Sequence, residues 1–340
     1  MTYNILMIVL GFALLVFGAD MLVKGSSNIA KRFHIPEMLI GLTIVAIGTS
    51  APELIITITS TQNSSTDLII GNAIGSNLCN LLLILGLMAV IRPVKIDKEA
   101  RNFHIPMAFL ASLVILLMGL GILGNSTQYI NQMEGFFLII LFVVYFSYPI
   151  VKEFEDIVNS YKKEKKARIK AKEKSANSKI SGTASHSKRK NRVFISLLLI
   201  VVGVFLLKYG GDFVVDSATN IALYFNISER VIGLTVVAIG TALPELVTSI
   251  FAAIRKDTDI AVGNLVGSCV LNLFLILGIG AMITPLEFTP DFIQNLILLC
   301  SMTLVLWLFN FMGKRDTITR PKGIVLLGVF ALYMVSLFVY

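Results

Sequence analysis

Long apolar stretches separated by short polar segments follow one another along the whole chain. Ten stretches approach or exceed the length of about 20 residues that an α-helix needs to cross the hydrocarbon of a bilayer. They lie near residues 4–22, 38–60, 68–91, 103–123, 133–151, 193–215, 230–254, 259–284, 292–312 and 323–340. The pattern predicts an all-α membrane protein with ten transmembrane helices. The first stretch lacks a basic leading region, so we interpret it as a retained span and not as a signal peptide.

Composition supports a membrane protein and changes the meaning of the charge. Of 340 residues, 56% are hydrophobic and 15% charged, with a mean hydropathy of +0.82, which is too apolar for a soluble domain. The net charge of +8 is concentrated in residues 152–192, which hold 14 basic and 5 acidic residues. A nucleic-acid partner is therefore not indicated. Cys79, Cys269 and Cys300 lie in apolar stretches and suggest no disulfide framework or thiolate cluster.

The basic residues also predict an orientation, because Lys and Arg near span ends prefer the cytoplasmic side. With the N-terminus outside, 27 of 29 basic residues fall in cytoplasmic connections, and only Lys208 and Arg230 lie outside. We expect a multi-pass protein of the cell membrane with both termini extracytoplasmic and the linker 152–192 cytoplasmic. The linker is too short and polar for a folded regulatory domain. Its charge is interpreted as fixing topology, with attraction to anionic lipid as the alternative.

An internal repeat is the most informative feature of the sequence. Residues 41–58 match residues 233–250 at 12 of 18 positions, and residues 71–86 match residues 263–278 at 10 of 16, both at an offset of 192. We therefore divide the chain into a first half (1–151), the basic linker and a second half (193–340). Five spans per half is an odd number, so the second copy enters the membrane from the opposite side. The sequence predicts two inverted five-helix repeats, an architecture of secondary transporters.

One carboxylate lies near the middle of the second span of each half, Glu53 in GTSAPEL and Glu245 in GTALPEL. A charged side chain at this depth costs about 3 kcal/mol or more, so we interpret both as functional. The structural alternative is a protonated glutamate bonded to a neighbouring helix. Its occurrence at two equivalent positions argues against that alternative.

Prolines precede both glutamates and predict broken helices at the midplane. Pro52 and Pro244 lack the N–H that would reach the carbonyls of Gly48 and Gly240. With glycine at those places, we expect the helices to break there and to free the carbonyls around 46–49 and 238–241 as ligands. A simple packing kink is the alternative.

Oxygen-bearing side chains recur at four-residue spacing near these breaks, which places them on one helical face. The four sets, in chain order, are Thr49, Glu53 and Thr57; Asn72, Ser76 and Asn80; Thr241, Glu245 and Ser249; and Asn264, Ser268 and Asn272. Interhelical hydrogen bonding explains Asn72 and Asn264 equally well. An all-oxygen set fits a hard cation such as Ca²⁺ and fits soft transition metals poorly. Two carboxylates match one divalent ion or two monovalent ions, which suggests competition at a shared site.

The paired GTSAPE and GTALPE stretches, together with the paired GNxxGS segments, resemble the alpha repeats of the sodium/calcium exchangers in the cation/calcium antiporter superfamily. The resemblance spans both halves. It implies electrogenic Ca²⁺ extrusion driven by inward Na⁺ flow and by alternating access, with no enzymatic activity and no cofactor beyond the transported ions. A monomer is expected.

The resemblance also implies roles for individual residues. Glu53 and Glu245 would be shared by Ca²⁺ and Na⁺, and Thr49 and Thr241 would bind Ca²⁺ through their backbone. The remaining roles divide between flanking Na⁺ sites and the centre: Ser50, Ser76, Ser268 and the carbonyls of Ala46 and Ala238 at the flanks, and Asn80 and Asn272 at the centre.

Two departures from the repeat pattern affect these expectations. Ala242 stands where the first half has Ser50, so one flanking Na⁺ site lacks a hydroxyl. Asn272 is an amide where the potassium-dependent branch carries an aspartate, so we expect no K⁺ cotransport.

Three other functions stay open at this point. A proton/calcium antiporter is the nearest alternative, since glutamates carry protons, although His34, His104 and His186 lie away from the midplane. A passive cation channel would also use oxygen-lined sites. A serine hydrolase at Ser50 is disfavoured because no His or Lys lies at that depth to activate it.

Overall fold

A computed structural model describes residues 2–33, 35–62, 66–123, 128–174, 186–225 and 238–339. The first half contains the elements α1 (Thr2–Phe33), α2 (Glu37–Ile40), η1 (Gly41–Val45), α3 (Ala46–Thr49), α4 (Ala51–Gln62), α5 (Thr66–Leu78), η2 (Cys79–Ile84), α6 (Leu85–Ile91), β1 (Val94–Lys95), η3 (Ala100–His104), α7 (Ile105–Gly119), β2 (Tyr129–Ile130) and α8 (Gln132–Lys174). The second half contains α9 (His186–Tyr224), α11 (Ala238–Thr241), α12 (Leu243–Ile254), α13 (Thr258–Val270), η5 (Leu271–Ile276), α14 (Leu277–Ile283), β3 (Leu286–Glu287), α15 (Pro290–Phe309), β4 (Thr317–Ile318) and α16 (Arg320–Val339). The η elements are π-helical turns.

The helices confirm the all-α membrane class. Eight helices in the described ranges are long and apolar enough to span a bilayer, and the number is nine if the helix pair Glu37–Thr49 and Ala51–Ile58, bent by 43°, forms one span. The tenth expected span, near 230–254, lies partly outside the described residues. Its described remainder includes α12, which is apolar but only 12 residues long. The tenth span therefore stays a prediction.

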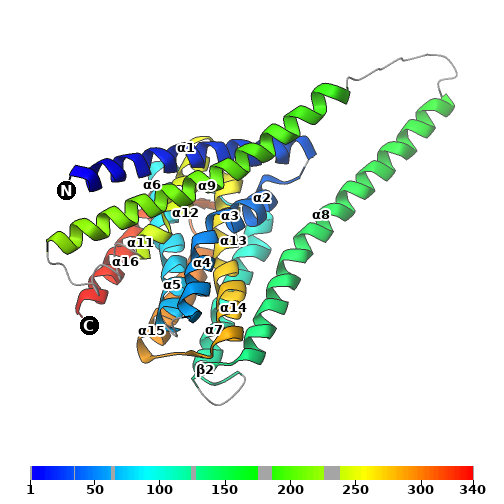
Figure 1. Cartoon of the computed structure of the whole chain (residues 1–340). Helices are drawn as coiled ribbons and strands as arrows, with labels where there is room; N and C mark the ends of the chain where they lie inside the picture. The colour runs from blue at the N-terminus through cyan, green and yellow to red at the C-terminus, as the bar shows by residue number, and fades with distance from the viewer. Residues whose placement is uncertain are drawn as a thin grey trace.

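The basic segment between the halves is more helical than the sequence suggests. Helix α8 continues beyond residue 151 to Lys174, and α9 begins at His186. Both helices project together past the rest of the bundle at one end of the molecule (Figure 1). The described parts of this segment, residues 152–174 and 186–192, are thus extensions of two spans, whereas the sequence predicted only a polar linker there.

The repeat in the sequence recurs in the element boundaries. Helices α4 and α12 start and end 192 residues apart, as do α5 and α13, the π-turns η2 and η5, and α6 and α14. Two short antiparallel strand pairs connect the halves, because β1 pairs with β4 and β2 pairs with β3.

Helices α1 and α9 are the first elements of the two halves and lie side by side across the bundle (Figure 1). Glycines allow this close packing. A Cβ on Gly18 would lie 2.9 Å from the carbonyl oxygen of Gly203, and one on Gly210 would lie 2.8 Å from that of Gly11. Residue numbers rise along one helix as they fall along the other, so the helices run antiparallel. This is the arrangement that an inverted repeat requires.

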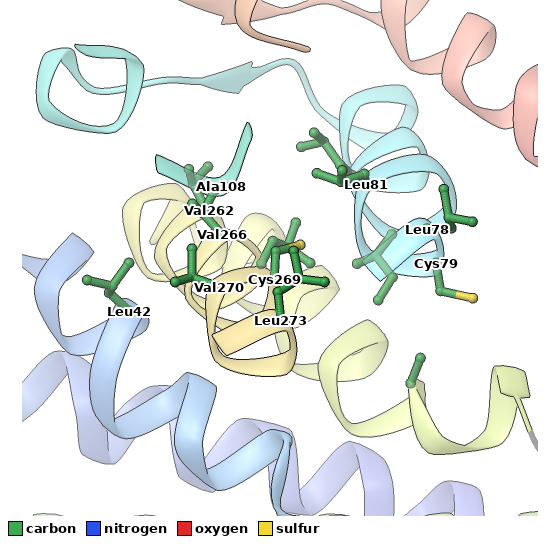
Figure 2. Close-up of a cluster of buried hydrophobic side chains, with 14 of the residues drawn as sticks. Leu42, Leu78, Cys79, Leu81, Ala108, Val262, Val266, Cys269, Val270 and Leu273 are labelled. Atoms are coloured by element: carbon green, nitrogen blue, oxygen red, sulfur yellow. The ribbon is translucent and has the colours of Figure 1, made fainter. Parts of the chain in front are cut away.

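The central helices form the core that holds the site. In the spans Thr66–Ile91 and Thr258–Ile283, 72% and 78% of the most apolar window is buried, against 28% in α1. Figure 2 shows Val262, Val266 and Val270 of α13 in a cluster of buried apolar side chains with Leu42 and Ala108. Apolar side chains on the peripheral helices are instead exposed on the protein surface, as expected for residues that face lipid.

Candidate ion-binding site

The two helix breaks lie next to the prolines, as expected, but not at the glycines. Helix α3 ends at Thr49 and α4 begins at Ala51, with the break at Ser50 (φ −85°, ψ 10°). Helix α11 ends at Thr241 and α12 begins at Leu243, with Ala242 between them (φ −82°, ψ 0°).

Gly48 and Gly240 were expected to help break the helices, and each break lies two residues beyond the glycine and two before the proline. Each glycine lies inside a short helix that precedes a break, because Pro52 and Pro244 are instead accommodated in the first turn of the helix that follows. The glycines serve packing. A Cβ on Gly48 would lie 2.8 Å from a methyl group of Val204, and one on Gly240 would lie 2.1 Å from a methyl group of Val215, both on α9.

Glu53 and Glu245 lie in the first turns of α4 and α12, and both are buried, with exposed fractions of 0% and 1%. Neither carboxylate oxygen of Glu53 has a hydrogen-bond partner among the described residues, and Oε2 of Glu245 has none either. A buried carboxylate without a partner is costly. These unpaired oxygens are what a cation would coordinate.

Ser50 connects the first break to the second half. Its hydroxyl donates to Oε1 of Glu245 at 2.9 Å and lies 3.0 Å from the hydroxyl of Ser268. The family resemblance implied flanking Na⁺ sites for Ser50 and Ser268, and the structure brings the two hydroxyls together, with that of Ser50 also on Glu245. Ala242, the counterpart of Ser50, has no hydroxyl with which to repeat this contact.

The threonines that end the broken helices are held by asparagines of the opposite half. The Thr49 hydroxyl donates to Oδ1 of Asn264 at 3.1 Å, and the Thr241 hydroxyl donates to Oδ1 of Asn72 at 3.4 Å. Asn264 also donates through Nδ2 to the Ser249 hydroxyl at 3.1 Å. For both asparagines the structure therefore shows the interhelical hydrogen bonds that the sequence left as an equal alternative.

Asn80 and Asn272 occupy the second residue of the π-turns η2 and η5. Both are buried, and Oδ1 of each lacks a hydrogen-bond partner among the described residues. Wide π-turns are frequent at functional sites. The sequence identified the two amides but gave no signal for the π-turns that carry them.

The remaining predicted ligands differ in their surroundings. Ser76 lies on α5 with its hydroxyl buried and unpaired among the described residues. The carbonyl of Ala46 accepts from the backbone N–H of Ser50 at 2.9 Å and from the Thr49 hydroxyl at 3.4 Å. Ala238 is the first residue of α11, at the edge of the described residues.

The arrangement favours binding of a hard cation. It gathers carboxylate, amide and hydroxyl oxygens from α4, α5, α12, α13 and the two π-turns in a buried centre. Within the described ranges, no group of three or more His, Cys, Asp and Glu residues forms a metal cluster. Mixed neutral and charged oxygen ligands suit Ca²⁺ and Na⁺ better than transition metals.

The helical bundle, its apolar spans and its buried all-oxygen centre are the features of an integral membrane protein with a cation-binding site. The chain belongs to the sodium/calcium exchanger protein family, whose model matches residues 3–151 and 195–339. The resemblance of the alpha-repeat motifs is thereby confirmed.

Individual relatives align along nearly the whole chain. The inner membrane protein YrbG of Escherichia coli (strain K12) is 32% identical over 98% of this chain and 96% of its own. The sodium/calcium exchanger MaX1 of Methanosarcina acetivorans is 31% identical over 99% of each chain. The solved structure of the sodium-calcium exchanger NCX_Mj soaked with Na⁺ and Sr²⁺ has a TM-score of 0.79 at 30% identity, covering 98% of this chain and 99% of the other.

Sequence reasoning missed the layer of side chains behind the ligands. Asn77 on α5 donates to the backbone carbonyl of Cys269 at 3.0 Å and accepts from Nδ2 of Asn272 at 3.1 Å. Asn77 lies inside the matched segment 71–86, but the second half has Cys269 at the equivalent position. A search for residues repeated in both halves therefore does not find Asn77.

Proposed function

We propose that this chain is a secondary active antiporter that exchanges Ca²⁺ for Na⁺ by alternating access. The observation that carries the proposal is the pair of buried glutamates, Glu53 and Glu245, of whose four carboxylate oxygens three have no hydrogen-bond partner among the described residues. Membership of the exchanger family supports the same class of activity.

Coupling follows from the cost of the empty site. Two unneutralised carboxylates in a low-dielectric centre disfavour the transition between the two access states, whereas one Ca²⁺ or two Na⁺ neutralise them. The carrier therefore changes access when loaded and exchanges ions without leaking. Glu53 and Glu245 serve both ions in turn, and the backbone of Thr49 and Thr241 contributes to the Ca²⁺ position.

Flanking Na⁺ sites make the exchange electrogenic in this proposal. Ser50 bonds to Glu245 and lies beside Ser268, and Ser76 lies on α5 with Asn72, one helical turn before Asn80 of η2. If Na⁺ fills the flanks as well as the shared centre, more than two Na⁺ enter for each Ca²⁺ that leaves. Because Asn80 and Asn272 are neutral amides, we propose that K⁺ is not transported.

The proposed architecture is two inverted five-helix repeats with both termini outside and residues 152–192 in the cytoplasm. The antiparallel packing of α1 and α9 supports the inversion. The distribution of basic residues supports the orientation. In a cell with Na⁺ entering down its gradient, this carrier extrudes Ca²⁺ and acts as a monomer.

Flux in proteoliposomes under imposed gradients tests the exchange mode. The purified chain is reconstituted with Ca²⁺ outside, and an outward gradient of Na⁺, of K⁺ or of protons is imposed at otherwise fixed composition. We expect Ca²⁺ uptake with the Na⁺ gradient and none with the K⁺ or proton gradient. An inside-positive membrane potential should accelerate this uptake. Uptake that follows the proton gradient and ignores Na⁺ would support the H⁺/Ca²⁺ antiporter instead, and single-channel currents would indicate a channel.

A further inference from the structure

A chain of hydrogen bonds crosses between the halves directly behind the site. Asn77 lies on α5, facing α13 and η5, and is 0% exposed. Its Nδ2 donates to the backbone carbonyl of Cys269 at 3.0 Å, and its Oδ1 accepts from Nδ2 of Asn272 at 3.1 Å. Asn77 itself does not belong to the set of expected ion ligands.

The chemistry of this chain fixes which way each amide points. A backbone carbonyl only accepts, so the Asn77 atom that faces Cys269 must be Nδ2. Oδ1 of Asn77 then faces Asn272, which must donate a hydrogen bond to it through Nδ2. The O and N atoms of an amide side chain are usually hard to tell apart, but here the backbone carbonyl can only accept a hydrogen bond, which fixes the assignment. Asn272 is left with Oδ1 directed away from Asn77, and that oxygen is buried and unpaired.

The equivalent contact in the other half is weaker. Cys269 occupies the repeat position of Asn77, 192 residues later, so the second half has a thiol where the first half has the amide that bonds to Asn272. A thiol is a weak partner that does not discriminate strongly between the two ends of an amide. Asn80 is therefore oriented less firmly than Asn272.

We propose that Asn77 is a positioning residue, which turns the carbonyl oxygen of Asn272 toward the transported cation and keeps its amide N–H groups away. The inference rests on the proposed function, because it takes Asn272 as an ion ligand. Without Asn77, rotation of the Asn272 side chain presents Nδ2 to the ion, and the partial positive charge of that group opposes binding.

Equilibrium Ca²⁺ titration of the full-length protein in detergent tests this assignment. Asn77→Leu keeps the number and branching of the side-chain heavy atoms and removes both hydrogen bonds. Asn77→Ala is the second variant if the larger Leu does not yield monodisperse protein. We expect the Ca²⁺ dissociation constant to rise about tenfold, the effect of one hydrogen bond near the upper end of its usual range. Ser112→Ala is the control, since it removes a buried hydrogen bond to the carbonyl of Phe109 away from the site, and should change the constant less than about twofold.

Asn77→Leu in an Asn272→Asp background distinguishes orientation of the residue-272 side chain from a general packing role of Asn77. Both oxygens of an aspartate accept, so no donor can be turned toward the ion, and the penalty of Asn77→Leu should disappear. A penalty of equal size in both backgrounds, or none in the native background, would overturn the proposal. Absence of Ca²⁺ binding in the unsubstituted chain would overturn both proposals, whereas binding without Na⁺-driven transport would overturn the proposed function alone.

Discussion

The two halves of the site share their glutamates and central asparagines but support them differently. Glu53 and Glu245 match, as do Asn80 and Asn272. Behind them, Glu245 receives a hydrogen bond from Ser50, whereas both oxygens of Glu53 are unpaired among the described residues. The duplication thus preserved the groups that meet the ion, and the groups that hold them have diverged.

The asparagines that hold the helix breaks show the same difference. Asn264 bonds to both Thr49 and Ser249. In the first half, Nδ2 of Asn72 and the hydroxyl of Thr57, the counterparts of Asn264 and Ser249, are both buried and unpaired within the described part of the chain. Asymmetry of this kind is what a repeat protein shows when its two halves are in different arrangements, as alternating access requires.

The largest effect is expected where the halves agree. Glu53→Gln and Glu245→Gln each remove half of the negative charge that a divalent ion needs. We expect either variant to lower Ca²⁺ flux in proteoliposomes by about 100-fold or more, because breaking a buried charge pairing costs several kcal/mol. Full-rate Ca²⁺ exchange by either variant would show that the two carboxylates are not equivalent partners in one site.

The asparagines provide the next comparison. Asn264→Ala removes two hydrogen bonds and should lower the free energy of unfolding by about 2–3 kcal/mol, against about 1 kcal/mol for Asn72→Ala, which removes one longer bond. Thermal unfolding in detergent measures both. Equal shifts for the two variants would mean that the observed asymmetry has no energetic weight.

Ser50 and Ala242 allow the difference to be reversed. Ser50→Ala removes an oxygen beside Glu245 and should raise the Na⁺ concentration for half-maximal exchange about three- to tenfold, while Ala242→Ser should lower it. The Na⁺ dependence of Ca²⁺ flux measures both effects. Ser112→Ala is the control, because that buried serine bonds to the carbonyl of Phe109 away from the site. A change in Ca²⁺ dependence alone would argue against a Na⁺ role for Ser50.

The smallest effect concerns the peripheral helices. Asp20 on α1 pairs with Lys24 of its own helix at 2.6 Å and also with Arg255 beyond the end of α12. Asp212 on α9 pairs with Lys208 of its own helix at 3.4 Å. All these pairs are partly exposed, so each is worth about 1 kcal/mol or less. Arg255→Gln should lower the unfolding temperature by about 2 °C, and Lys208→Gln should leave it unchanged. A larger shift for Lys208→Gln would reverse the comparison.

Much of this organisation could be predicted from the sequence because apolar length and repetition are direct physical signals. The spans, the broken helices and the glutamates follow from hydropathy, from proline and from the cost of buried charge. The break at Ser50 could not be placed, because Gly48 proved to be a packing residue against Val204, and such contacts depend on a distant helix.

The π-turns and the relay through Asn77 lay outside prediction for a similar reason. Asn80 and Asn272 were identified by spacing, but the hydrogen bond from Asn272 to Asn77 joins residues 195 positions apart. The repeat itself hid that bond, because its symmetry pairs Asn77 with Cys269.

Ca²⁺ and Na⁺ should compete for the two glutamates if the proposed exchange is correct. Calorimetric titration of the protein with Ca²⁺ at several fixed Na⁺ concentrations measures this competition. Choline replaces Na⁺ to keep the ionic strength constant. We expect the apparent Ca²⁺ dissociation constant to rise with the Na⁺ concentration. On logarithmic axes the slope should be about two or more, because two monovalent ions neutralise the charge that one divalent ion neutralises. A Ca²⁺ affinity that does not change with Na⁺ would contradict the proposed exchange.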